Sequence, residues 1–335
     1  MRGIGSFLLA VGFLSCTAVP RSRRAIVEYA VPQRADAPDL PSPRADTAIV
    51  VAIDGVRWQD VFTGDLPVLR RWMTTEGAAI GAPGHGEMWA SGPNYLSLPG
   101  YTEIFTGRPS ACQSNGCDAI QAPTMIDEAS SLGWPTAVVS SWEVIDRAAA
   151  RDPQRTMLST GRYHTEHAEA FGASLIAGRQ AGPEPGFANY RRDEATIRVA
   201  LDLVGSRAPK LMFIGLGDTD ERAHRGQGVQ YLEALRAADS FLGELEKRVS
   251  DRTAILVTSD HGRNAEFREH GGRWPESGRV WLVAKGGGIA ARGLLDEPVH
   301  HLADIAPTIR CLLGMPRLET PDAGEAITSL CRARR

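Results

Sequence analysis

The sequence predicts an α/β domain in which a mostly parallel central sheet has helices on both faces and a small cap insert. Short, continuous apolar runs indicate strands that are buried on both sides, at residues 47–53, 136–140, 211–216, 253–258 and 280–284. Segments 191–207 and 231–249 instead have apolar residues at helical spacing, which predicts helices between strands. Alternation of buried strands with helices is typical of a parallel sheet covered on both sides.

Composition and charge agree with a globular domain. Hydrophobic residues make up 43% of the 335 positions and charged residues 23%, so the chain can bury a full core. The 37 lysines and arginines are balanced by 40 acidic residues, which gives a net charge of -3. A basic field able to neutralise nucleic-acid phosphates is therefore not expected, and the sequence predicts no nucleic-acid-binding surface.

The N-terminal segment predicts export. Residues 1–18 contain one arginine, an apolar run and small residues, which is the layout of a signal peptide. Cleavage before Cys16 would leave a lipid anchor on the membrane, whereas cleavage after Ala18 would release a soluble protein. Residues 19–46 predict a flexible linker, and residues 47–335 the folded domain. We expect a periplasmic, envelope-anchored or secreted protein.

The remaining four cysteines predict two disulfides. Without Cys16 the number is even, which suits an oxidising compartment. Cys112 and Cys117 flank a short loop, and Cys311 could reach Cys331 near the C-terminus. No spacing of a sulfur-ligated zinc site is present.

Acidic residues follow three of the predicted strands. Asp54 follows the first strand, Asp218 and Asp220 follow residues 211–216, and Asp260 follows residues 253–258. The carboxyl ends of parallel strands meet at one edge of a sheet, so these carboxylates should converge.

Three histidines accompany the acidic residues. His224 stands four positions after Asp220, His261 is adjacent to Asp260, and His270 lies in a later loop. Mixed histidine and carboxylate ligands favour zinc, with manganese or iron also suitable, over magnesium or calcium, which prefer oxygen ligands.

The order of these motifs resembles the alkaline phosphatase superfamily. The resemblance rests on Asp54-Gly, on Ser97-Leu-Pro with a helix that ends in Thr-Gly, on Asp220-x-x-x-His224, on Asp260-His261-Gly and on His270-Gly. The branch that looks most similar is the nucleotide pyrophosphatase/phosphodiesterase type.

The resemblance implies a two-metal active site. One divalent ion, most simply Zn²⁺, would be held by Asp220, His224 and His270, and a second by Asp54, Asp260 and His261. Ser97 would be shared between them as the nucleophile, so a small phosphate ester would be cleaved through a phosphoseryl intermediate. Asn115, in the loop between Cys112 and Cys117, would contact the phosphate.

Several alternatives remain open at this stage. Tyr101 stands where sulfatases have arginine, and residues 118–210 leave little room for the inserted domain of cofactor-independent phosphoglycerate mutases. Phosphonate hydrolysis, sulfatase-like hydrolysis, phosphoryl transfer and a non-catalytic metal-binding protein are the competing functions. The choice between monoesters and diesters would depend on residues 81–93 and 161–186.

Individual residues also have alternative roles. Ser97 could be an ordinary helix N-cap, and His300 or His301 could replace His270 as a ligand. Asp218 could be only a turn residue, and Arg57 could contact the substrate or form a salt bridge. His164 and His167 could line a substrate cap or simply lie in a solvated loop.

Overall fold

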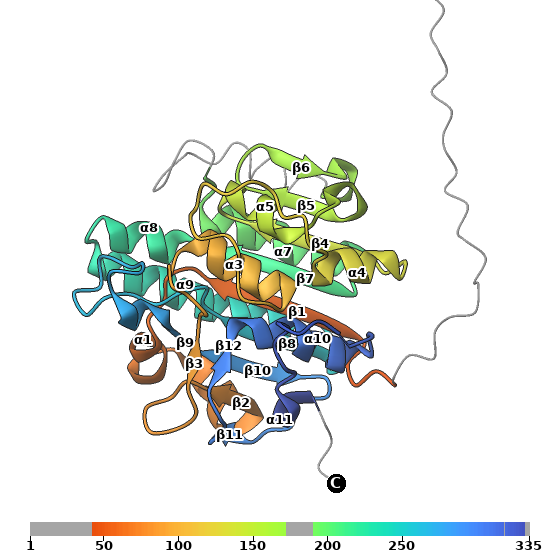
Figure 1. Ribbon diagram of the computed structural model, residues 1–335. Coiled ribbons are helices and arrows are strands. Elements are labelled where there is room, and N and C mark those ends of the chain that lie inside the picture. The colour runs from red at the N-terminus through yellow and green to blue at the C-terminus, as the bar shows by residue number, and fades with distance from the viewer. Residues whose placement is uncertain (1–41, 172–189, 318, 332–335) are drawn as a thin grey trace, which may run out of the picture. The chain divides into compact units, whose positions relative to one another are not determined.

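A nine-stranded sheet forms the centre of the described chain (Figure 1). The computed structural model describes residues 42–171, 190–317 and 319–331. The strand order is β11-β2-β10-β8-β1-β7-β4-β5-β6, and a second sheet has the order β12-β3-β9. The strands are β1 (Thr47–Ile53), β2 (Gly77–Ile80), β3 (Met88–Trp89), β4 (Thr136–Ser140), β5 (Met157–Thr160), β6 (His164–Glu166), β7 (Leu211–Leu216), β8 (Thr253–Thr258), β9 (Arg279–Val280), β10 (Leu282–Gly286), β11 (Gly293–Leu294) and β12 (His300–His301).

The centre of the large sheet is parallel, as predicted. Strands β8, β1, β7, β4 and β5 pair in parallel, while β10 and β6 add antiparallel pairs at either side. Four of the five predicted strands have the predicted bounds. The prediction of one strand at 280–284 was wrong, because β9 pairs with β3 and β10 pairs with β8. Between them, the buried Trp281 donates its indole N–H to the Val56 carbonyl at 3.1 Å.

Helices cover both faces of the sheet. Along β1, Ala48, Val50 and Ala52 face one apolar cluster, and the alternate residues Ile49, Val51 and Ile53 face the other. Figure 1 shows α3 and α10 in front of the sheet and α7 and α9 behind it. The helices are α1 (Trp58–Thr63), α2 (Pro67–Arg71), α3 (Ser97–Thr106), α4 (Met125–Ser131), α5 (Asp146–Ala149), α7 (Asp193–Arg207), α8 (Asp218–His224), α9 (Gly228–Glu246), α10 (Ile305–Leu313) and α11 (Thr328–Cys331).

The predicted signal peptide, including Cys16, and most of the predicted linker lie outside the described residues. The end of the predicted linker already contacts the domain before Thr47. The backbone N–H groups of Arg44 and Ala45 both donate to the Leu312 carbonyl. Of the predicted cap insert at 161–186, the described part comprises β6 and a short 3₁₀ helix at Ala168–Ala170. Among the helices of residues 42–171, 190–317 and 319–331, none has the length and apolar character needed to cross a bilayer.

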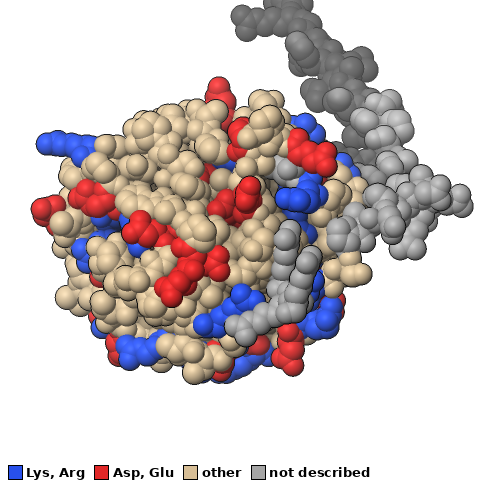
Figure 2. Space-filling model, turned by 60° about the horizontal axis from the view of Figure 1, so that its bottom comes forward, with Lys and Arg blue, Asp and Glu red and all other residues tan. Residues whose placement is uncertain are grey.

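Both predicted disulfides are present. Cys112 is bonded to Cys117 and Cys311 to Cys331, with Cα–Cα distances of 6.0 and 5.8 Å. On the face of the molecule shown in Figure 2, lysine and arginine side chains lie in small groups around acidic ones.

Candidate metal site and nucleophile

Three neighbouring strands bring the predicted carboxylates to one edge of the sheet. Strand β1 lies between β7 and β8, with Ile53 opposite Leu216 and Ala52 opposite Thr258. The chain therefore leaves all three strands at the same level, and Asp54, Asp220 and Asp260 follow within a few residues.

The first ligand group consists of Asp54, Asp260 and His261. One ligand atom from each lies within 4.8 Å of the others. His261 Nε2 is 3.5 Å from Asp54 Oδ1 and 3.5 Å from Asp260 Oδ2, and all three residues are buried. Burial and the neighbouring Asp260 charge raise the pKa of Asp54 to about 7, and burial raises the pKa of Asp260 to about 7. Burial lowers the pKa of His261, which keeps its imidazole neutral and able to bind a metal.

The second ligand group consists of Asp220, His261 and His270, again with one atom of each within 4.8 Å of the others. The predicted ligand His224 borders this group, since its Nε2 is 3.3 Å from Asp220 Oδ2 and 3.0 Å from His270 Nε2. His270 Nδ1 lies 2.9 Å from the Tyr95 carbonyl, which fixes the proton on Nδ1 and leaves a lone pair on Nε2. The structure thus brings the six predicted aspartate and histidine ligands together, with His261 adjoining both groups.

In the ligands of both groups, one polar atom is held by the protein and another remains for an ion. Asp54 Oδ2 accepts from the Tyr101 hydroxyl at 2.9 Å, and Asp260 Oδ1 accepts from the Gly55 N–H at 3.1 Å. His261 Nδ1 is 2.8 Å from the Gly262 carbonyl. Asp260 Oδ2 is buried and has no hydrogen-bond partner among the described residues. An unpaired buried carboxylate oxygen beside oriented imidazoles fits a bound divalent cation.

Ser97 lies at the edge of the first group. It is the first residue of α3, and its Oγ is 3.2 Å from His261 Nε2 and 3.4 Å from Asp54 Oδ1. The N-cap position belongs to Leu96, where no side chain caps the helix, so the N-cap interpretation of Ser97 is not supported. Gly100 permits this close approach of α3, because a Cβ there would lie 2.3 Å from the Asp260 carbonyl oxygen.

Asn115 and Ser97 line one cavity. Its volume is about 580 Å³, and its lining includes Asp54, Asp220, His224 and His270. Asn115 Oδ1 accepts the Leu98 N–H at 3.0 Å, which leaves the amide NH₂ as the group able to donate to a ligand. The other lining residues, which the sequence did not single out, are Leu96, Trp142, Tyr190, Gly217, Glu221, Arg225 and Glu269.

Arg263 and Tyr101 complete the site, although the sequence did not indicate these roles. The Arg263 guanidinium contacts Asp220 Oδ1, and its Nε donates to the Gly55 carbonyl at 2.9 Å. The sequence does contain one signal for Arg263. It stands two positions after the predicted ligand His261, so its backbone must lie near the site. Tyr101 lies one helical turn after Ser97 and so faces the same way.

The other candidate residues have structural partners. Asp218 accepts the Tyr190 hydroxyl at 2.7 Å and is outside both ligand groups, and Arg57 forms a salt bridge with Asp60 at 2.8 Å. His300 pairs with Asp304 at 2.9 Å, so His270 rather than His300 joins the ligands. His164 forms an ion pair with Asp146, and His167 lies 3.3 Å from Glu169.

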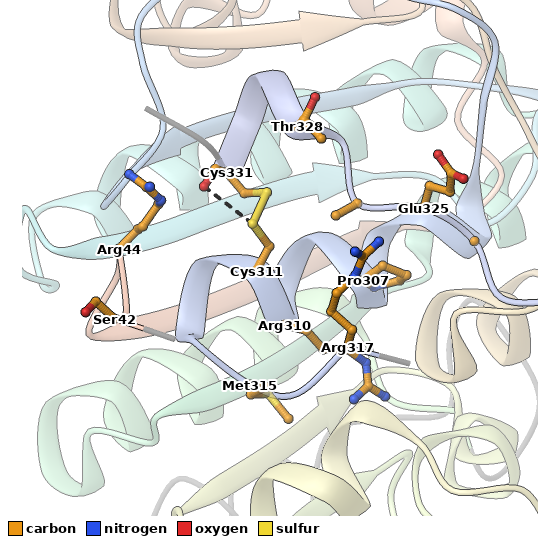
Figure 3. A pocket seen from close by; sticks show the side chains of 12 residues that line it. Ser42, Arg44, Pro307, Arg310, Cys311, Met315, Arg317, Glu325, Thr328 and Cys331 are labelled. Atoms are coloured by element: carbon orange, nitrogen blue, oxygen red, sulfur yellow. Dashed lines mark hydrogen bonds between the residues drawn. A yellow bond between two sulfur atoms is a disulfide. The ribbon is translucent and has the colours of Figure 1, made fainter. Parts of the chain in front are cut away.

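A second cavity has a volume of about 530 Å³ (Figure 3). Arg44, Arg310 and Arg317 line it, together with the Cys311–Cys331 disulfide. None of the residues described as its lining belongs to either ligand group.

Comparison with known proteins supports the architecture. Residues 185–317 match the family model described as "Metalloenzyme superfamily". The wild-type alkaline phosphatase PafA aligns with 87% of this chain and 100% of its own, at a TM-score of 0.61 and 14% identity. A 2-O GAG sulfatase, BT1596, aligns with 87% of this chain and 75% of its own, at a TM-score of 0.61 and 12% identity. The chain has the fold of the alkaline phosphatase superfamily.

This confirms the resemblance at the level of the fold, while the likeness to the nucleotide pyrophosphatase/phosphodiesterase type stays a prediction. In sequence, the chain is 30% identical over 159 residues to a 2,3-bisphosphoglycerate-independent phosphoglycerate mutase of Synechococcus elongatus, covering 42% of this chain and 29% of the relative. It is 31% identical over 102 residues to GPI ethanolamine phosphate transferase 1 of Gibberella zeae, covering 29% of this chain and 10% of the relative. The chain therefore spans less than a third of the length of these two relatives.

Proposed function

We propose that this protein is an exported, metal-dependent hydrolase of phosphate esters that acts through a covalent phosphoseryl intermediate on Ser97. The observation that carries the proposal is the arrangement of two adjoining ligand groups, in which each carboxylate and imidazole is held by a protein partner at one polar atom, around a buried serine hydroxyl. The formation of both disulfides agrees with an oxidising compartment.

Two divalent ions of the zinc class would neutralise the carboxylates, favour ionisation of the Ser97 hydroxyl and stabilise charge on the leaving oxygen. Asp54, Asp260 and His261 would hold one ion, and Asp220, His224 and His270 the other. The Tyr101 and Gly55 hydrogen bonds keep Asp54 and Asp260 in their orientations. These contacts reduce the reorganisation that would otherwise accompany metal binding.

Ser97 is suited to attack because His261 and Asp54 fix its Oγ at the cavity wall. Attack on phosphorus would form the Oγ–P bond as the bond to the leaving alcohol breaks. Water would then cleave the phosphoserine, releasing the phosphate product and restoring the hydroxyl. The Asn115 amide would orient the phosphate during both steps.

The test is a substrate panel assayed after chelation and after addition of Zn²⁺ or Mn²⁺. The panel comprises p-nitrophenyl phosphate, bis-p-nitrophenyl phosphate, a phenyl phosphonate and p-nitrophenyl sulfate. We expect metal-restored turnover of a phosphate ester that exceeds turnover of the sulfate. Asp260→Asn should retain the fold and lose most of that turnover. Full activity of the metal-free protein, or sulfate as the best substrate, would reject the proposal.

A second candidate is phosphoryl transfer to an alcohol acceptor. It is favoured by the sequence similarity to a phosphoglycerate mutase and to an ethanolamine phosphate transferase. The two functions share the phosphoseryl intermediate and differ in whether water or an alcohol receives the phosphoryl group. Adding glycerol or ethanolamine to the assay distinguishes them, because a transferase would form a phosphorylated acceptor in place of free phosphate.

A further inference from the structure

The Cys112–Cys117 disulfide closes the loop that contains Asn115. The two cysteines are five positions apart, and Asn115 stands between them. Ser114, Asn115 and Gly116 are exposed and belong to no helix or strand. Cys112 and Cys117 pack against the apolar core, whereas the three exposed residues between them have little packing to hold their backbone in place.

Two side chains of this loop bind the segment around the nucleophile. Asn115 accepts the Leu98 N–H at 3.0 Å, directly after Ser97. Gln113 contacts Asn94, whose Nδ2 donates to the Gln113 carbonyl at 3.0 Å and whose N–H donates to Gln113 Oε1 at 3.3 Å. Asn94 and Leu98, on either side of the nucleophile, are thus hydrogen-bonded to the ring of residues 112–117 that the disulfide closes.

Hydrogen bonds of this kind hold an exposed loop only weakly, since water competes for the same groups. A cross-link between positions five apart restricts the conformations open to the residues between them. The carboxamide of Asn115 lines the cavity with Ser97, so the ring fixes a polar group that faces the reacting centre.

We propose that the Cys112–Cys117 disulfide is a positioning element of the active site, which holds the Asn115 amide where it binds the phosphate of the substrate. This inference rests on the proposed function of Ser97 and Asn115. The disulfide acts through Asn115 and touches no reacting atom itself. Its loss raises KM for a phosphate ester more than it lowers kcat, and it leaves the metal content unchanged.

The experiment compares two disulfide variants on the same phosphate ester. Cys112→Ser/Cys117→Ser should lower kcat/KM about tenfold, mainly through KM, which corresponds to the loss of one oriented contact. Cys311→Ser/Cys331→Ser is the matched control, because that disulfide borders the separate cavity of Figure 3. The control should keep the wild-type KM even if its thermal stability falls.

A double-mutant cycle tests whether the effect passes through Asn115. Asn115→Ala should give a similar loss, and combining it with Cys112→Ser/Cys117→Ser should cause little further loss. An unchanged KM in the disulfide variant would overturn the proposal. So would a loss of kcat/KM in the combined variant equal to the product of the two separate losses.

A binding measurement separates this proposal from the proposed function. If the wild-type protein hydrolyses no phosphate ester, the proposed function fails. Binding of inorganic phosphate to the zinc-loaded protein then decides the role of the disulfide. The Cys112→Ser/Cys117→Ser variant should bind phosphate about tenfold more weakly than the wild type, or 1.4 kcal/mol. Equal affinities would reject the positioning role.

Discussion

Arg263 places its guanidinium against the carboxylate of Asp220, inside the group of predicted metal ligands. Arg263 is 3% exposed, and its NH1 donates to the Arg268 carbonyl at 2.9 Å. Burial lowers the pKa of Arg263 to about 10, so the side chain stays charged at neutral pH. An ion bound to Asp220 must therefore share that carboxylate with a fixed positive charge, unlike an ion bound to Asp54 and Asp260.

This contact predicts two metal sites of unequal affinity. In calorimetric titration of the metal-free protein with Zn²⁺, we expect one tight and one weaker event. Arg263→Gln should tighten the weaker event by at least about tenfold, because it removes the competing charge. Arg252→Gln is the control, since Arg252 pairs with Asp46 at the opposite end of β1. Weaker zinc binding in Arg263→Gln would show instead that Arg263 chiefly orients Asp220.

Metal affinity should rise with pH. In the metal-free protein the pKa values of Asp54 and Asp260 are raised to about 7, so both carboxyls hold protons in mildly acidic solution. A binding cation must displace those protons, and zinc affinity should increase between pH 5.5 and 8. Chelator competition at several pH values measures this. An affinity that does not change over this range would contradict the raised pKa values.

The same two carboxyls predict how the stability of the metal-free protein depends on pH. The pKa values of both carboxyls are higher in the folded state than in the unfolded state. Their stabilising contribution to the free energy of unfolding is therefore fully present below pH 4 and is lost as the pH rises through 7. Zinc should therefore raise the melting temperature more at pH 8 than at pH 5.5. The increase should be much smaller in Asp260→Asn, and an equal increase at both pH values would refute the linkage.

The Cys311–Cys331 disulfide should stabilise the fold without affecting the site. It joins α10 to α11 across 20 positions, and Figure 3 shows the bond between the two sulfur atoms. Chain-entropy arguments assign a loop of this length about 3 kcal/mol of unfolding free energy. Cys311→Ser/Cys331→Ser should lose that amount in denaturant unfolding and keep its zinc content. A loss below about 1 kcal/mol would mean that packing of α11 alone holds the C-terminal segment.

The strand ends could be predicted from the sequence because the signal there is local. Continuous apolar runs fix β1, β7 and β8, and the acidic residues that follow them must meet if the strands are parallel neighbours. The division of residues 280–284 into β9 and β10 has no such signal, because it depends on pairing with distant strands. Periodicity within one segment cannot show which partner each residue has.

The contacts that orient the metal ligands could not be predicted from the sequence either. The Arg263–Asp220 pair joins residues 43 positions apart, and the Tyr101–Asp54 hydrogen bond joins residues 47 positions apart. Arginine and tyrosine also have many structural roles, so their presence in a sequence does not mark a site. The different roles of Asp218 and Asp220 have a local reason, because residues two positions apart in the first turn of α8 point in different directions and meet different partners.

Ser97 should be required for turnover and dispensable for metal binding. Its Oγ faces His261 and Asp54, and it does not cap α3, so removing the hydroxyl leaves the helix and both ligand groups in place. Ser97→Ala should therefore keep two bound zinc ions and lose at least about 10³-fold in kcat, a loss expected when a nucleophile is removed. Ser97→Thr should keep measurable activity, because threonine presents the same hydroxyl, although its methyl group must fit beside His261. Metal analysis and turnover measured on the same preparations decide between the roles. A Ser97→Ala protein with full metal and an unchanged rate would exclude Ser97 as the nucleophile, whereas loss of both metal and turnover would make it primarily a ligand.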